Sequence, residues 1–254
     1  MPKHFVASGC SFTEGRGWPF TIPDYFPDVE LHNMGMASQG NGFIARKAQY
    51  KIFDLLDKGV NPKDIYLGVM WSGPTRMEFF FEDMWEEPLS AQQSDGWDPN
   101  TGNPSHFIPE AEGSWFIVDI NWSHSIAREW YQSSLSNATA YHIRTYEYIL
   151  STQNFCKSLG IDFFMTQFNR WVVEDKHDND LNLRWMRKMI DWDKWLPIDG
   201  CFEWVFLNST NPWPDRGDEM TIDTPRHPTT AQHKEFTQCA IVPHLKQSAW
   251  GSDK

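Results

Sequence analysis

The sequence predicts an α/β fold built on a central parallel β-sheet with helices on both faces. Short apolar runs alternate with longer segments in which apolar residues recur at helical spacing. The run at residues 64–71 is almost continuously apolar, as expected for a central strand that is covered on both faces. Strands that alternate with helices favour a parallel sheet. In such sheets, ligands bind beyond the carboxyl ends of the strands.

The predicted elements follow one another through most of the chain. Gly59 and Gly160 each follow a helical segment and are expected to end it, because glycine readily adopts the backbone conformation of a helix C-cap. Pro228 is expected at the start of the last helix, where a missing N–H costs nothing. We expect strands at residues 4–8, 29–33, 64–71 and 161–168, and helices at residues 42–58, 138–159, 181–195 and 229–247.

One long segment, residues 82–136, does not fit this alternation. It is rich in turn-forming residues, and within it only residues 115–120 read as a short strand. A segment of this length inside a compact domain is usually functional, so we interpret it as a Trp-rich lid or substrate-pocket insertion. A chain of 254 residues is long enough for one sizeable core, and we expect residues 1–254 to form a single domain.

The composition argues against several classes of partner. The formal net charge is -12 and the pI is near 5.1, so nucleic acid, which is bound by clustered lysines and arginines, is not an expected partner. No apolar stretch approaches the roughly 18 residues that a membrane span needs, and the first residues lack a signal-peptide pattern. We therefore predict a cytoplasmic protein with no membrane partner, or a virion-associated one if the source is viral. The sequence leaves the oligomeric state open.

Cysteine usage gives no sign of a metal site or a disulfide framework. The four cysteines, Cys10, Cys156, Cys201 and Cys239, are scattered and form no CxxC pair. Free thiols in a reducing compartment are the expected state. We expect neither a metal nor a cofactor.

Tryptophan is unusually frequent, with 14 residues. Many lie between residues 71 and 130 or between residues 171 and 213, in segments that are also rich in Gly, Pro, Asp and Asn. Two interpretations are open. Either the indole rings pack the long loops, or several of them form exposed platforms that contact sugar rings or apolar acyl groups.

Three residues at opposite ends of the chain have the layout of a serine nucleophile with its base and orienting acid. Ser11 directly follows the first predicted strand, and Asp223 and His227 precede the last helix. A serine hydroxyl is a weak nucleophile until a base takes its proton, and an acid can hold that base in place. Each residue alone has a simpler interpretation: Ser11 as a helix cap, and His227 as a surface histidine. Asp218 and Glu219 are further candidates for the acid.

Two loops that follow predicted strands are expected to supply donors for an oxyanion. The first, residues 32–42, is glycine-rich, and in it we single out Ser38, Gly40 and Asn41. The simpler interpretation is a turn with Asn41 as a helix cap. In the second, residues 71–78, Ser72 can donate a hydroxyl, Gly73 an amide and Arg76 a charged fork. Here the simpler interpretation is a surface pair between Arg76 and Glu78 or Glu82.

These short motifs together resemble the SGNH/GDSL hydrolases. Gly9-Cys10-Ser11-Phe12-Thr13 is similar to the nucleophile block, residues 33–41 to the glycine block of the oxyanion hole, and residues 223–228 to the terminal Asp-x-x-His-Pro block, with His233 where a second histidine often follows. The resemblance implies a flavodoxin-like three-layer α/β/α fold and esterase, lipase, thioesterase or carbohydrate-deacetylase activity without a metal. It also implies Ser11, His227 and Asp223 as the catalytic residues.

The chain departs from the family pattern at three places. Cys10 replaces an aspartate, Ser72-Gly73-Pro74 replaces the block with an asparagine donor, and Asp223 lies four rather than three residues before His227. The serine in place of the asparagine, with a Trp and an Arg nearby, is similar to the pattern in divergent GDSL-like proteins of phages and marine microbes.

The expected function is therefore hydrolysis of a carboxylic ester, such as an O-acetyl group on a carbohydrate. Its substrate would be a small molecule or a glycan ester. The alternative is a non-catalytic carbohydrate-binding or virion-associated protein on the same fold. A metallohydrolase using His32, His106, His124 or His177 is a weaker third hypothesis, because these histidines lack a tight ligand spacing such as HExxH.

Overall fold

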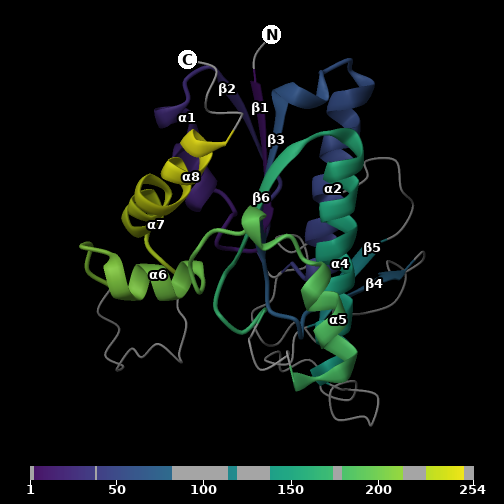
Figure 1. The fold of residues 1–254 in the computed structure, drawn as a ribbon. Coiled ribbons are helices and arrows are strands. Elements are labelled where there is room, and N and C mark those ends of the chain that lie inside the picture. Colours follow the sequence, from purple (N-terminus) through teal and green to yellow (C-terminus); the bar gives the residue numbers. More distant parts are fainter. Residues whose placement is uncertain are drawn as a thin grey trace.

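The centre of the protein is a four-stranded parallel sheet. The computed structural model describes residues 3–37, 39–81, 114–118, 138–173, 179–213 and 227–248. The strands lie in the order β2-β1-β3-β6, and every pairing is parallel. Their bounds are β1 (Lys3–Gly9), β2 (Val29–Asn33), β3 (Ile65–Trp71) and β6 (Asp162–Gln167). The predicted α/β class with a central parallel sheet is confirmed (Figure 1).

Helices cover both faces of this sheet. On one side lie α2 (Asn41–Asp57), α4 (Ala138–Leu159) and α5 (Leu181–Met189), and on the other α1 (Ile22–Tyr25), α6 (Cys201–Asn208), α7 (Thr230–Phe236) and α8 (Val242–Gln247) (Figure 1). Alternate side chains of β1 enter the two cores, as the pleat of a strand requires. Val6 packs with Ile44 of α2, whereas Phe5 packs with Trp18 on the opposite face.

The register of the strands brings their carboxyl ends to one edge. Gly9 at the end of β1 pairs with Met70 of β3, and Trp71 at the end of β3 pairs with Gln167 of β6. The loops that follow these strands therefore begin side by side. This edge is where a parallel sheet presents its ligand-binding groups.

A second, smaller sheet lies outside the main one. It pairs β4 (Met77–Phe81) antiparallel with β5 (Ser114–Val118). The second of these strands overlaps the strand predicted at residues 115–120. The rest of the Trp-rich insertion at residues 82–136 lies outside the described residues.

The structure differs from the sequence prediction mainly in short helical segments. The helix predicted over residues 181–195 ends at Met189, and a 3-10 turn (Trp192–Lys194) follows it. The predicted last helix is divided by a π-helical segment (Thr237–Ile241) between α7 and α8. The 3-10 segments Trp18–Thr21 and Pro62–Asp64 and the short helices α1 and α6 were not predicted. One or two turns contain too few residues to show helical periodicity.

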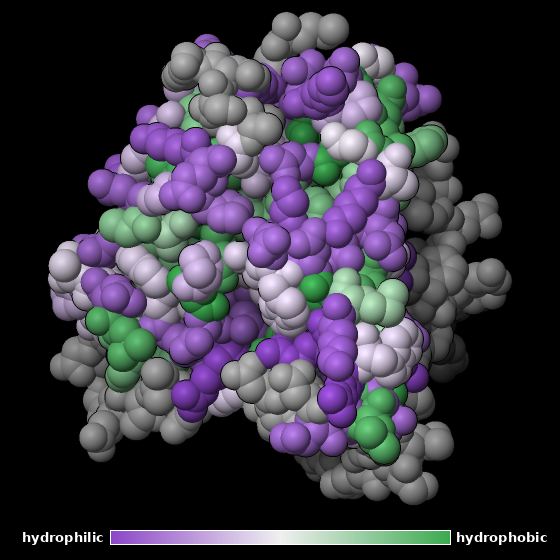
Figure 2. Space-filling view, viewed as in Figure 1, coloured by the Kyte–Doolittle hydropathy of each residue, from purple (hydrophilic) through white to green (hydrophobic). Residues whose placement is uncertain are grey.

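The surface is largely hydrophilic on the face drawn in Figure 2, with scattered apolar patches. Within the described ranges, no helix combines the length and the apolar character needed to cross a membrane.

Candidate active site

Ser11 and His227 lie within hydrogen-bonding distance, although 216 positions separate them in the sequence. The distance between Ser11 Oγ and His227 Nε2 is 2.6 Å. Ser11 is partly buried and His227 is exposed, so the pair is open to solvent. When Nε2 carries no proton, the serine hydroxyl donates to it. This is the geometry that a general base needs to take a proton from a serine.

Ser11 occupies the corner of a tight turn directly after β1. The carbonyl oxygen of Cys10 accepts hydrogen bonds from the N–H groups of Thr13, at 2.8 Å, and Glu14, at 3.1 Å. The next helical segment begins only at Trp18, and its N-cap is Gly17. Ser11 therefore does not cap a helix.

Two glycines allow Thr13 to sit beneath this turn. A Cβ atom on Gly9 would lie 2.1 Å from Thr13 Oγ1, and one on Gly35 would lie 2.7 Å from the Thr13 side chain. Asn33 Nδ2 also donates to the Thr13 carbonyl oxygen at 2.7 Å. The loop after β2 is thereby fixed against the turn that carries Ser11. Thr13 and Asn33 were not singled out as site residues from the sequence.

His227 precedes a firmly capped helix. Thr229 is the N-cap of α7, and it forms a reciprocal capping box with Gln232 at 2.8 and 3.2 Å. The capping box satisfies the N–H groups of Thr229 and Gln232, which fixes the chain two residues beyond His227. Pro228, between them, is buried.

A chain of buried hydrogen bonds joins the C-terminal helices to the turn with Ser11. The Thr237 hydroxyl donates to the Trp18 carbonyl oxygen, and Trp18 Nε1 donates to Thr13 Oγ1 at 2.9 Å. All three residues have no exposed surface. Because each bond is buried, breaking it would leave a polar group without water. These contacts account for how two distant segments reach the same edge.

The His227 imidazole packs against the aromatic ring of Phe12. The Phe12 ring lies 5.1 Å from the His227 ring and 5.9 Å from that of His233, measured between centroids. Phe168, which follows β6, contacts Phe12 edge-on at 5.6 Å. The imidazole thus rests on the apolar residue next to Ser11.

His233 is kept neutral beside this pair. Its side chain is almost fully buried, and Nδ1 has no hydrogen-bond partner among the described residues. Desolvation, and to a lesser degree the charge on His227, lower the pKa of His233 to about 4. At neutral pH it therefore adds no positive charge next to the candidate base.

In the described part of the loop after β2, a backbone amide is available as a donor. Gly40 is the extended N-cap residue of α2, and its N–H has no acceptor within the described residues. Asn41 is buried, and its amide is used inside the fold. Nδ2 donates to Ser72 O at 3.0 Å and to Thr145 Oγ1 at 3.1 Å, while Oδ1 accepts from Ser72 N at 2.7 Å. Ser38 lies outside the described residues.

In the loop after β3, the polar groups of Ser72 turn inward. Ser72 has no exposed surface, its N–H is bound to Asn41, and its Oγ accepts from Arg76 Nη1 at 2.7 Å. Gly73 is partly exposed, and its N–H has no acceptor in the described part of the chain. A Cβ atom there would meet nothing closer than Phe168, at 3.8 Å. The Gly73 amide is therefore an available donor in the described part of this loop.

A partly buried lysine, Lys47, is linked to Gly9 through the side chain of Gln39. With its amide oriented to satisfy both neighbours, Gln39 donates to the Gly9 carbonyl oxygen and accepts from Lys47 Nζ, each at 3.1 Å. Desolvation lowers the pKa of Lys47 to about 8, and the charge of Glu14 partly opposes this shift. Lys47 and Gln39 were not identified from the sequence, because their part in the site depends on how the loop folds onto α2.

Several sequence candidates lie outside the described residues. Among them are the acid Asp223 and its alternatives Asp218 and Glu219, as well as His106, His124 and His177. The side chains of Glu78 and Glu82, proposed partners of Arg76, are outside them too.

Some tryptophans of the described ranges are buried and others are exposed. Trp18 and Trp71 are fully buried, whereas Trp171, Trp185 and Trp192 are between 39% and 56% exposed. Trp171 belongs to the segment that follows the carboxyl end of β6, so it begins at the same edge as Ser11.

No protein-family model, curated protein or solved structure matches this chain. The described residues define an α/β protein with a serine–histidine pair at the carboxyl edge of its parallel sheet.

Proposed function

We propose that this protein is a serine hydrolase that cleaves a carboxylic ester, with Ser11 as nucleophile and His227 as general base. The observation that carries the proposal is the 2.6 Å distance between Ser11 Oγ and His227 Nε2. Its position supports the proposal too, because the pair lies at the sheet edge where α/β enzymes bind ligands. A chance surface contact would not need the buried Thr237–Trp18–Thr13 connection that holds the two segments together.

The reaction follows from this geometry in two steps. Ser11 Oγ attacks the acyl carbon while His227 Nε2 takes the hydroxyl proton, and the tetrahedral intermediate collapses as that proton passes to the leaving alcohol. A water molecule then attacks the acyl-serine, with His227 again taking a proton and returning it to Ser11 Oγ. A positioned base contributes about 10²–10⁴-fold to such a reaction. Asp223 is proposed to hold the imidazole, with Asp218 or Glu219 as alternatives.

Backbone amides are the proposed donors for the oxyanion. The N–H groups of Ser11, Gly40 and Gly73 have no acceptor within the described ranges. Ser72 is a poorer candidate, because its N–H already donates to Asn41 and its hydroxyl is fully buried. We therefore assign the third donor position to the Gly73 amide. Each oxyanion donor contributes about 10²–10³-fold to turnover. Lys47, which donates to Gln39 in the loop after β2, adds a positive charge near Gly9.

The fold and the substrate class extend this proposal. The strand order β2-β1-β3-β6 corresponds to the first four strands of the flavodoxin-like order 2-1-3-4-5, which supports a divergent SGNH/GDSL-like hydrolase forming one domain. The exposed Trp171 suits stacking on a sugar ring, so an O-acetyl ester on a carbohydrate is the proposed substrate. The mechanism requires neither a metal nor a cofactor.

Replacing each of the two serines tests this assignment. We expect Ser11→Ala to lower p-nitrophenyl acetate hydrolysis by at least about 10³-fold without changing the circular dichroism spectrum. The matched control is Ser72→Ala, the same chemical change in the neighbouring loop, which should retain more than about a tenth of the wild-type rate. Wild-type hydrolysis by Ser11→Ala would overturn the assignment.

A second candidate is a non-catalytic carbohydrate-binding or virion-associated protein on the same fold. The internal use of Asn41 and Ser72 favours it, because the two loops expected to supply side-chain donors supply none from these residues. Glycan binding without turnover, with Ser11 unreactive towards an acylating ester, would select this candidate.

A further inference from the structure

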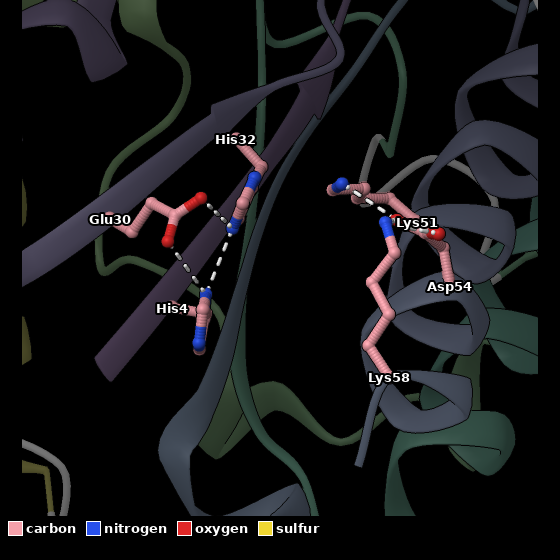
Figure 3. Close-up of polar contacts among 6 residues, drawn as sticks. All are labelled: His4, Glu30, His32, Lys51, Asp54 and Lys58. Carbon is pink, nitrogen blue, oxygen red and sulfur yellow. Dashed lines mark hydrogen bonds and ion pairs between the residues drawn. The ribbon is translucent and has the colours of Figure 1, made fainter. Parts of the chain in front are cut away.

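Two histidines and a glutamate converge at the opposite end of the sheet from Ser11. His4 belongs to β1, and Glu30 and His32 are alternate residues of β2. The parallel register pairs His4 with Glu30 and Val6 with His32, so all three side chains share one face of the edge strand pair. Figure 3 shows the two imidazoles and the Glu30 carboxylate, which lies beside both rings and forms a contact with each.

The ligand atoms of this cluster lie close together. His4 Nδ1 and His32 Nε2 are 3.0 Å apart, and a Glu30 carboxylate oxygen lies 3.6 Å from each of these nitrogens. The two imidazoles are nearly parallel, with an interplanar angle of 16°. Their side chains are only 9% and 11% exposed, whereas that of Glu30 is 57% exposed. The group is therefore buried on its histidine side and open to solvent on its carboxylate side.

We propose that His4, Glu30 and His32 bind one Zn²⁺-type divalent ion. Two facing imidazole nitrogens can share only one proton between them, whereas an ion can accept both lone pairs. Ligands about 2.0–2.1 Å from a tetrahedral zinc lie about 3.3 Å from one another, close to the separations seen in the cluster. Small side-chain rotations are enough to bring all three atoms to one ion.

The donor set decides which ion fits. Imidazole nitrogens suit zinc and its neighbours in the first transition row, whereas Mg²⁺ and Ca²⁺ require oxygen ligands. Three protein ligands leave at least one coordination position for water, and the exposed Glu30 lies on the side from which water enters.

The surrounding charges are compatible with a cation. Lys51 of α2 is a positive group close enough to act electrostatically on His32, and it forms an ion pair with Asp54 at 2.8 Å. Asp54 also pairs with Lys58 at 2.7 Å, as Figure 3 shows. The carboxylate of Asp54 thus offsets much of the charge that Lys51 presents to the cluster.

The site is separate from the proposed ester chemistry. Gly9 lies five positions after His4 in β1, a length of about 16 Å in an extended strand, and Ser11 lies beyond Gly9. A bound ion would instead join β1 to the edge strand β2. Its expected consequence is a more stable sheet edge.

Metal titration of the whole chain, expressed without a polyhistidine tag and freed of metal by a chelator, tests this proposal. We expect ZnCl₂ to bind at one ion per chain in isothermal titration calorimetry. At a free zinc concentration about 100 times Kd, the melting temperature should rise by about 5–10 °C. This readout does not depend on hydrolysis at Ser11.

Three variants assign the binding to these residues. Glu30→Gln and His32→Gln should each weaken zinc binding by at least about 100-fold. The Glu30 variant changes an exposed side chain, so its fold should persist, and circular dichroism checks both proteins. His142→Gln, which alters a partly exposed histidine on α4, should bind zinc as the wild type does. No zinc binding by the wild type, or equal binding by all variants, would overturn the site.

Discussion

Two loops at the carboxyl edge of the sheet each carry a serine directly after a strand, yet they present it in opposite ways. After β1, Ser11 is partly exposed and its hydroxyl meets His227. After β3, Ser72 is fully buried and both its N–H and its Oγ are used inside the fold. Position at a strand end therefore does not decide whether a serine hydroxyl is open to solvent. What decides is whether the fold already satisfies its donors and acceptors.

The packing beneath each loop explains the difference. Below the first loop, Thr13 fills the space left by two glycines and bonds to Trp18, so the turn holds Ser11 outward. Below the second, Asn41 at the start of α2 bonds to the Ser72 N–H and carbonyl oxygen and draws that loop inward. The loop with Ser11 packs on Thr13, whereas the loop with Ser72 is hydrogen-bonded to Asn41 at the start of α2.

Removing the Asn41 side chain should have the largest effect on stability. Asn41→Ala deletes three buried hydrogen bonds and leaves the Ser72 N–H without a partner. We expect the free energy of unfolding to fall by about 3 kcal/mol, measured by urea denaturation. The matched control is Gln49→Ala on the same helix, whose contact with Ser151 is long, at 3.4 Å, and solvent-exposed. A loss no larger than that of the control would mean that Asn41 does not hold the second loop.

His233 allows a smaller, pH-dependent test of the support under the first loop. Its pKa is lowered to about 4 by burial, whereas in the unfolded chain it is about 6.5. The unfolded state therefore binds the proton more readily, so this stability is present above about pH 6.5 and is lost as the pH falls towards 4. Between pH 8 and pH 5 the loss is about 2 kcal/mol.

Replacing this histidine by leucine should remove the pH dependence that it causes. We expect the decrease in unfolding free energy between pH 8 and pH 5 to be about 2 kcal/mol smaller in His233→Leu than in the wild type. Urea denaturation at the two pH values measures it. An unchanged decrease would show that His233 takes up its proton equally well in the folded protein.

Much of the fold could be predicted from the sequence. The strand at residues 29–33 and the helix at residues 138–159 have the predicted bounds. The pairing of Ser11 with His227 was predicted from their chain order and from the motifs in which they lie. These features depend on local pattern and on topology, both of which the sequence carries directly.

The hydrogen-bond partners could not be predicted in the same way. Asn41 and Ser72 are polar residues in loops, and the sequence does not reveal whether their groups face a substrate or each other. The Thr237–Trp18–Thr13 connection spans most of the chain, and His4 meets His32 only through the register of β1 and β2. Each of these depends on three-dimensional placement at the scale of single atoms.

The reactivity of Ser11 towards a fluorophosphonate tests the central claim most directly. We expect one equivalent of the reagent to form an Oγ–P bond at Ser11 with release of fluoride, located by peptide mass spectrometry. Labelling should slow by about 10²–10⁴-fold in His227→Ala, because no base takes the hydroxyl proton. A folded wild-type protein that is not labelled, or is labelled at a residue other than Ser11, would contradict the account.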